Sequence, residues 1–416
     1  MGQRLLLFAA TTGYQIRVFA DAARRLGVEV TLATDRCGSL DDPWGDHAIP
    51  VKFDRRMPAS LGVFDGMSFD GVAAVGDGPA VLAAEIARRL GIPFHPPEAA
   101  RACQDKYRAR QLYRAAGLPV PGFFRAPLAE DPDALAERAP YPCVLKPLGL
   151  SASRGVIRAN DAAEFRAAFA RIRKMLEGSP DLRFARSPYL QVETYIPGRE
   201  FAIEGLVTGG RFQPLAIFDK PDRLEGPFFE ETLYVTPARE PAEVQEALIE
   251  TTARAVRALG LEHGPVHAEL RHNPRGTWML ETAARPIGGL CAKALRFQGG
   301  VPLEELIVRH ALGEDVSAAR IEGPASGVMM IPIPKGGIYE AVEGVERARA
   351  VPGIEDVIVT AKEGQRLVPL PEGASYLGFI FAQGDSPAGV EAALRQSHAE
   401  LRFRIATALE TLRPST

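Results

Sequence analysis

The first hundred residues alternate short apolar runs with stretches whose apolar positions recur at helical spacing. Residues 5–10 and 28–33 predict strands, and residues 15–27 between them predict a helix. Residues 71–75 predict a further strand, which a helix over residues 79–90 follows. Because strands and helices alternate, we expect βαβ units that build a parallel sheet covered by helices.

Two glycine-containing loops, residues 11–14 and 76–79, come directly after predicted strands. Both would lie at the carboxyl ends of strands, where open α/β sheets bind ligands. Neither loop has the G-x-G-x-x-G spacing of a dinucleotide site, so such a site is not predicted. A ligand-binding loop and an ordinary glycine turn both remain open at each position.

The rest of the chain divides into three further regions. A boundary at Pro93, Pro96 and Pro97 precedes a predicted helix over residues 98–116. Residues 120–194 predict a compact α+β unit, with strands at 122–125, 143–146, 155–158 and 189–194 and a helix over 162–176. The next region ends in a helix over 302–312, and the last predicts strands at 327–333, 355–359 and 376–383 and a terminal helix over 387–412. We therefore expect four domains, at residues 1–100, 101–195, 196–316 and 317–416.

Composition excludes several classes of protein. The 49 basic and 52 acidic residues give a net charge of −3, so no general positive field exists to attract nucleic acid or an acidic membrane. The four cysteines form no C-x-x-C pair, which is typical of a reducing cytoplasm without disulfides or a zinc ribbon. The apolar run at residues 5–10 is far shorter than a membrane span. We expect a cytoplasmic protein with no membrane segment.

A predicted hairpin over residues 266–281 brings two carboxylates together. Asn-Pro-Arg-Gly at residues 273–276 has the chemistry of a turn. A three-residue loop would pair Asn273 with Thr277, and counting back along the ladder places Glu269 directly opposite Glu281. Like charges in that position repel, so something must neutralise them.

Three kinds of group can neutralise this pair: a shared proton, a nearby arginine such as Arg271 or Arg285, or a divalent metal such as Mg²⁺. A plain solvated hairpin also fits the pattern. The same register places His267 opposite Ala283 and Arg285 farther along the same face. It also pairs Leu270 with Leu280 on the core side.

Two lysines and a turn suggest a nucleotide. Lys146 ends an apolar strand and precedes a loop of small residues at 148–155, which fits a phosphate clamp without being a Walker A motif. Lys106 begins a helix that Asp105 is expected to cap. Residues 191–201 predict a strand, a Pro-Gly turn and a second strand, whose backbone could contact adenine while Glu200 bonds a ribose. Solvated lysines and a plain hairpin remain open.

In order and spacing these motifs resemble the ATP-grasp carboxylate–amine ligases over roughly residues 100–300. The closest group is the L-amino acid ligases, which the form Glu281-Thr282-Ala283-Ala284-Arg285 and the segment from 317 to 416 resemble. The matching segments are 105–106, 144–147, 151–155, 193–200, 267–271 and 280–286. This resemblance implies an ATP-grasp fold of mixed α/β and α+β domains. Its parts would be a Rossmann-like N-terminal domain, a lid domain at 101–195, a large domain at 196–316 with the metal site, and a small C-terminal α+β domain.

The resemblance also implies roles. The nucleotide would be bound by Lys106, Lys146, Ser151, Ser153, Gly155, Glu193, Tyr195, Ile196 and Glu200. Glu269 and Glu281 would hold Mg²⁺, with Mn²⁺ as an alternative ion. Ala283 stands where many relatives have a third metal ligand, an asparagine, which puts the number of metal ions in doubt. Arg285 and Lys146 would spread the charge of the transferred phosphoryl group.

The expected reaction forms an amide from a small carboxylate and a small amine, presumed to be amino acids, through an acyl phosphate, and releases ADP and phosphate. Lys220, Glu231, Arg285, Gly288 and Gly289 are expected to face the substrates, although a surface loop fits the first two equally well. His267 assists amine deprotonation or has a structural role. Carboxylation, thioester formation and non-catalytic nucleotide binding are the alternative functions. A homodimer is the expected assembly.

Overall fold

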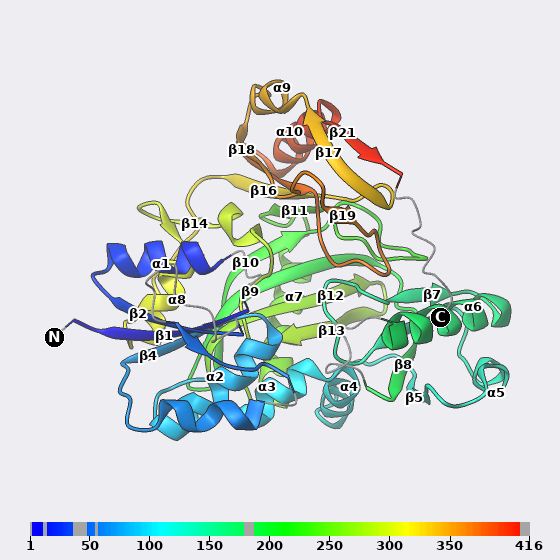
Figure 1. Cartoon of the computed structure of the whole chain (residues 1–416), viewed down its shortest axis with the longest axis horizontal. Coiled ribbons are helices and arrows are strands. Elements are labelled where there is room, and N and C mark those ends of the chain that lie inside the picture. The colour runs from blue at the N-terminus through cyan, green and yellow to red at the C-terminus, as the bar shows by residue number, and fades with distance from the viewer. Residues whose placement is uncertain (1, 11–14, 36–47, 55–56, 179–186, 408–416) are drawn as a thin grey trace, which may run out of the picture.

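The computed structural model describes residues 2–10, 15–35, 48–54, 57–178 and 187–407. Its N-terminal part is a parallel sheet in the order β3-β2-β1-β4, drawn in blue in Figure 1. The strands are β1 (Arg4–Ala9), β2 (Glu29–Thr34), β3 (Ile49–Pro50) and β4 (Gly71–Val75), and the helices are α1 (Ile16–Arg25), η1 (Met57–Phe64) and α2 (Asp77–Leu90). The predicted parallel sheet is confirmed. The loop at residues 11–14 lies outside the described residues, whereas the segment predicted as a loop at 76–79 consists of Gly76 and the first three residues of α2.

The helix predicted over residues 98–116 is wrong as a single element. It consists of α3 (Pro97–Gln104) and α4 (Lys106–Ala115), which Asp105 separates with an extended backbone. The Asp105 carboxylate accepts hydrogen bonds from the backbone N–H groups of Tyr107 and Arg108, both at 3.0 Å. The prediction that Asp105 caps the helix that begins at Lys106 is therefore confirmed.

A second, antiparallel sheet has the order β5-β8-β6-β7 and lies beside α5 and α6, on the right of Figure 1. Its elements are β5 (Phe123–Pro127), α5 (Pro132–Glu137), β6 (Cys143–Pro147), β7 (Ile157–Ala159), α6 (Ala162–Gly178) and β8 (Tyr189–Thr194). The Pro-Gly turn after β8 leads into a different sheet. The hairpin reading of residues 191–201 is therefore wrong, because β8 and β9 do not pair.

The third sheet has eight strands in the order β13-β12-β9-β10-β11-β16-β20-β18. The strands are β9 (Arg199–Thr208), β10 (Arg211–Asp219), β11 (Leu233–Thr236), β12 (His263–Asn273), β13 (Gly276–Ala283), β16 (Ala325–Ile331), β18 (Ile354–Val359) and β20 (Gly378–Gly384). The sheet runs across the domain boundary predicted at 316/317, because β11 pairs with β16 over four positions. That boundary stays a prediction, and the sheet shows that the last segment is built onto its neighbour.

The remaining elements of the described chain are α7 (Ala242–Leu259), η3 (Cys291–Ala294), β14 (Arg296–Phe297), β15 (Val301–Pro302), α8 (Leu303–Ala311), β17 (Gly337–Glu343), α9 (Val345–Arg349), β19 (Arg366–Leu367), α10 (Pro387–Ala399) and β21 (Arg402–Ala406). The terminal helix predicted to residue 412 is wrong beyond Ala399. The chain returns there as β21, which pairs with β17. Among the described residues, no helix is long and apolar enough to cross a membrane.

The β12–β13 hairpin has the predicted partners at its functional end but not at its turn. Asn273 pairs with Gly276, not Thr277, so the loop has two residues. A bulge at Leu280 then adds one residue to β13, and Glu269 comes to lie opposite Glu281 as predicted. Leu270 therefore pairs with Met279 in the core, and the predicted Leu270–Leu280 pair is wrong.

Candidate active site

A cavity of about 400 Å³ lies where the three sheets meet. Its walls come from the β4–α2 turn, the loop after β6, the end of β8, the face of β12 and β13, and the segment before β20. The predicted site residues that line it are Lys106, Lys146, Ser151, Ser153, Glu193, Tyr195, Ile196, Glu200, Glu231, His267, Glu269, Glu281, Arg285, Gly288 and Gly289. Residues separated by up to half of the chain therefore share one pocket of ligand size.

Two of the predicted site residues, Gly155 and Lys220, do not line this cavity. Gly155 has a φ of +71°, and a Cβ there would lie 2.7 Å from both Met175 and Pro147. Its N–H donates to the carbonyl of Pro371 at 2.8 Å. Glycine is therefore required at this position by backbone geometry and packing.

Lys106 connects the loop above the cavity to the paired carboxylates. Its Nζ donates to the carbonyl of Leu150 at 2.7 Å and lies 3.2 Å from the Glu281 carboxylate. Ala152 and Ser153 in the same loop have positive φ angles of 54° and 53°. This loop is thus held in a tight conformation directly over the lysine.

Lys146 meets a buried charge network that the sequence did not indicate. Glu193, only 2% exposed, forms an ion pair with Lys146 and a second with Arg110, whose Nε lies 3.0 Å away. Burial alone would raise the pKa of Glu193, but Arg110 and then Lys146 outweigh it and lower that pKa to about 2. Glu193 is therefore ionised and fixes the Lys146 ammonium group in the cavity wall.

Two backbone groups expected to contact adenine already have partners. The N–H of Tyr195 donates to the carbonyl of Pro142 at 2.8 Å, and the carbonyl of Ile196 accepts from Arg271 at 2.7 Å. These bonds fix the segment between β8 and β9 rather than leaving both groups for a ligand. For these two residues, the predicted adenine contact can therefore be made only by their other backbone groups or by the Tyr195 ring.

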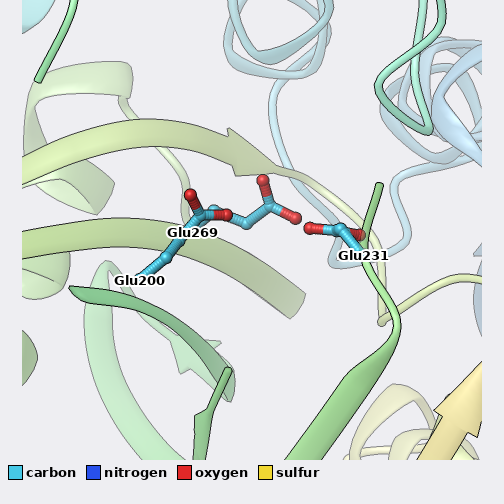
Figure 2. A group of neighbouring side chains, drawn as sticks. All are labelled: Glu200, Glu231 and Glu269. Atoms are coloured by element: carbon cyan, nitrogen blue, oxygen red, sulfur yellow. The ribbon is translucent and has the colours of Figure 1, made fainter. Parts of the chain in front are cut away.

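Three carboxylates converge beside the paired strands. Figure 2 shows that the side chains of Glu200, Glu231 and Glu269 point toward one another, and one oxygen of each lies within 4.8 Å of the others. Lys220, with 2% of its side chain exposed, contacts all three carboxylates. Its Nζ lies 2.9 Å from Glu200 and 3.4 Å from Glu269, and it also pairs with Glu231.

This cluster carries more negative than positive charge. Lys220 is held in its charged form, because the three carboxylates outweigh its burial and raise its pKa well above the usual value. Burial and the nearby Glu269 instead raise the pKa of Glu231 to about 7, although Lys220 opposes them. Arg271 at Glu200 and His267 at Glu269 add positive charge at the edge of the cluster, so a cation that enters here would compete with these groups for the carboxylates.

His267 lies between two acidic side chains. Its Nδ1 is bonded to Glu204, and its Nε2 lies 3.4 Å from Glu269. Burial would lower the pKa of His267, but Glu204 and Glu269 raise it to about 9. The imidazole is therefore a cation near neutral pH, and in that form it cannot accept a proton from a substrate amine.

The two arginines proposed as neutralising partners of Glu269 and Glu281 have other carboxylates. Arg271 bonds Glu200 at 2.9 Å, and Arg285 bonds Asp77 at 2.8 Å. The prediction that an arginine neutralises this pair by direct contact is therefore wrong. Glu281 instead pairs with Lys106, and Glu269 pairs with Lys220 and His267.

Three functional neighbours were missed: Asp77, Arg110 and Glu204. Asp77 lies in the segment predicted as a loop at 76–79, whose position after a strand was the one available signal, and it begins α2. Arg110 follows Lys106 by one helical turn, and Glu204 lies on the same face of β9 as Glu200. Neither spacing is specific enough to single out a site residue without the fold.

Comparisons with known proteins agree with this architecture. Residues 139–294 match the ATP-grasp domain family, and residues 329–406 match the family described as L-amino acid ligase C-terminal domain 2. The solved L-amino acid ligase of Bacillus licheniformis is 26% identical, with a TM-score of 0.82 over 98% of this chain and 99% of that one.

Two curated relatives are similar over part of their length. Alanine–anticapsin ligase of Bacillus subtilis is 26% identical over 240 residues, which are 54% of this chain and 50% of that ligase. Carnosine synthase 1 of Gallus gallus is 29% identical over 301 residues, which are 68% of this chain and 32% of that synthase. Together with the fold, these matches show that the chain combines an ATP-grasp domain with the C-terminal domain of the L-amino acid ligases.

Proposed function

We propose that this enzyme uses ATP to join two amino acids, or an amino acid and a similar small acid, through an acyl phosphate, with release of ADP and phosphate. The observation that carries the proposal is the shared cavity. It holds Lys106, Lys146 and Arg285 together with the opposed carboxylates Glu269 and Glu281. Phosphoryl transfer requires mainly positioned cations around the phosphates, and this cavity supplies them.

The nucleotide would occupy the side of the cavity nearest β6 and β8. Lys106 and Lys146 face the phosphates in this proposal, and the loop with Ser151 and Ser153 closes over them. Its tight backbone and its contact with Lys106 through the Leu150 carbonyl support this role. Glu193 acts through Lys146, and Glu200 bonds the ribose in this proposal.

The paired carboxylates fit a hard divalent cation. Glu269 and Glu281 are opposed on one face, line the cavity and supply oxygen ligands, which is the donor set that Mg²⁺ prefers and that Mn²⁺ also accepts. When bound, the ion would neutralise charge on the nucleotide phosphates. Lys106, which pairs with Glu281 now, would then be released toward phosphate oxygens.

The substrates would bind beside the nucleotide in the same cavity. Glu231 and the glycine pair Gly288-Gly289 line it, and the Glu231 carboxylate suits an ammonium group. Lys220 holds the cluster together from behind. His267, being cationic, suits a structural and electrostatic role beside Glu269 better than amine deprotonation.

The chemistry follows from the weakness of the two reactants. A carboxylate is a poor electrophile, so the γ-phosphoryl group is passed to it first, and Arg285 and Lys146 spread the charge of the transferred group. The neutral amine nitrogen, formed when the ammonium group gives a proton to solvent, then attacks the activated carbonyl. The C–O bond to phosphate breaks, the departing phosphate takes up the second proton from nitrogen, and an amide forms. Exclusion of water by the closed loop protects the intermediate from hydrolysis.

The direct test is incubation with ATP, Mg²⁺ and pooled amino acids, followed by mass spectrometry and a phosphate assay. Amide products formed in step with phosphate support the proposal, and replacing the pool with bicarbonate or coenzyme A tests carboxylation and thioester formation. Glu281→Gln should abolish turnover. If wild-type protein binds ATP but yields no product and no phosphate, non-catalytic nucleotide binding is the better account. The homodimer and the cytoplasmic location stay predictions.

A further inference from the structure

The N-terminal sheet contributes a carboxylate to the active-site cavity. Asp77 is the first residue of α2 and follows Gly76, which has a φ of +99° at the end of β4. This sharp turn directs the Asp77 side chain into the cavity, where one quarter of it is exposed. The same N-terminal unit supplies Gln15, whose side-chain amide donates to the carbonyl of Ile287 at 2.8 Å. Two contacts from this unit therefore hold the segment around Arg285.

The Asp77 carboxylate bonds the edge of the Arg285 guanidinium group that carries Nε and Nη2. Oδ1 accepts from Nε at 2.8 Å, and Oδ2 accepts from Nη2 at 3.4 Å. Nη1 donates to the carbonyl of Pro286 at 3.0 Å. Because each terminal nitrogen carries two N–H groups, Nη1 and Nη2 each keep one donor for an oxyanion. The arrangement fixes the plane of the guanidinium and leaves its end available.

Charge alone does not explain a carboxylate at this position. A site that binds phosphate is weakened by a negative group beside its cation, and this pair is ionised. Burial would raise the pKa of Asp77, but Arg285 outweighs it and lowers that pKa. Burial would lower the pKa of Arg285, and Asp77 raises it. The pair instead fixes the conformation of Arg285, because a free arginine side chain loses rotamer entropy when it is held in one place. With Asp77 in place, that loss precedes substrate binding.

We propose that Asp77 is a positioning residue for the ligase reaction. It acts through Arg285, whose free N–H groups it aims at the oxygens of the transferred phosphoryl group and of the acyl phosphate. The N-terminal sheet is then part of the catalytic apparatus and does more than support it. This inference rests on the proposed function, because it assigns Arg285 to the charge that develops during transfer. The rival reading is that Asp77 itself binds a substrate ammonium group.

The variant Asp77→Asn keeps an oxygen acceptor but loses the charge, and Asp77→Glu keeps the charge. We expect Asp77→Asn to lower kcat roughly 100-fold, the cost of an ångström-scale misplacement, while the KM for ATP changes by less than about twofold. Asp77→Glu should recover part of the loss. The matched control is Asp65→Asn, because Asp65 makes the same two-point contact with Arg89, at 2.7 and 3.0 Å, outside the cavity. Asp65→Asn should leave kcat unchanged.

A double-mutant cycle separates positioning from direct substrate binding. If Asp77 acts only through Arg285, adding Asp77→Asn to Arg285→Lys should change kcat by less than about twofold. If Asp77→Asn causes the same loss in both backgrounds, Asp77 contacts substrate itself and the inference is overturned. An active wild-type enzyme whose Asp77→Asn variant keeps its kcat also overturns it. A wild-type enzyme that forms no amide instead overturns the proposed function.

Discussion

Three histidines meet where the N-terminal unit contacts the large sheet, and they predict a loss of stability in acid. His95 lies between α2 and α3, His263 begins β12, and His310 belongs to α8. The rings of His263 and His310 stack with centroids 4.1 Å apart, and Nε2 of His95 donates to the carbonyl of Pro265 at 3.0 Å. Within the described residues, Nδ1 of His95 and Nε2 of His263 are buried without a hydrogen-bond partner.

This environment favours neutral imidazoles. Burial lowers the pKa of His95 from 6.5 to about 4, and burial together with His263 lowers that of His310 to about 4. The pKa of each folded-state ring is depressed, so the unfolded chain binds more protons below pH 6.5. These histidines therefore do not lower the free energy of unfolding above that pH, and they lower it progressively as the pH falls toward 4. At pH 5 the loss is about 2 kcal/mol for each of these two histidines.

The assay is urea unfolding at pH 7 and pH 5, followed by circular dichroism, for wild-type protein and the double variant His95→Gln/His310→Gln. Glutamine places an amide nitrogen near the position of Nε2, so it can keep the bonds to Pro265 and to Thr208, which lies 2.8 Å from His310. We expect wild-type protein to lose about 4 kcal/mol more than the variant between the two pH values. Equal losses in both proteins would refute the reasoning, because carboxylates elsewhere contribute equally to each.

Three substitutions test the packing around the site by the same unfolding measurement. Gly155→Ala should lower the free energy of unfolding by about 1–3 kcal/mol, because it adds strain at positive φ and overlaps Met175, whereas an unchanged midpoint would show that the loop adjusts freely. Arg110→Met should cost about 3–5 kcal/mol, since it leaves Glu193 with one cation in a buried site, and a neutral result would mean that Lys146 suffices. Glu372→Gln should cost less than about 1 kcal/mol, because its contact with Arg171 at 2.6 Å is exposed, and a larger loss would contradict that.

Sequence reasoning was most accurate where a residue's position followed from local periodicity. The strand at 71–75 and the strand at 189–194 have the predicted bounds, and the opposition of Glu269 and Glu281 is as expected. That opposition, however, came from a loop one residue too long, which the bulge at Leu280 compensates. A bulge leaves no clear mark in a sequence, because any residue can be the extra one.

The partners of charged side chains could not be predicted in this way. Arg285 was expected near the paired carboxylates, but its ion pair is with Asp77, more than two hundred positions away in the chain. Which acid meets which base depends on how separate sheets pack, and an isolated strand does not contain that information. For the same reason Arg110 was missed, although the lysine one turn before it was identified.

The junction of β11 with β16 has a consequence for how such enzymes can be assembled and divided. All four residues of β11 are buried, and it pairs with β16 at four positions but with β10 at only one. A protein cut after residue 316 would keep β11 as an unprotected edge, with apolar faces and unpaired backbone groups that invite association with other chains. The terminal segment is therefore not an independent unit. Recombination that exchanged it would need to supply a strand that fits this edge, so we expect the two parts to be exchanged together.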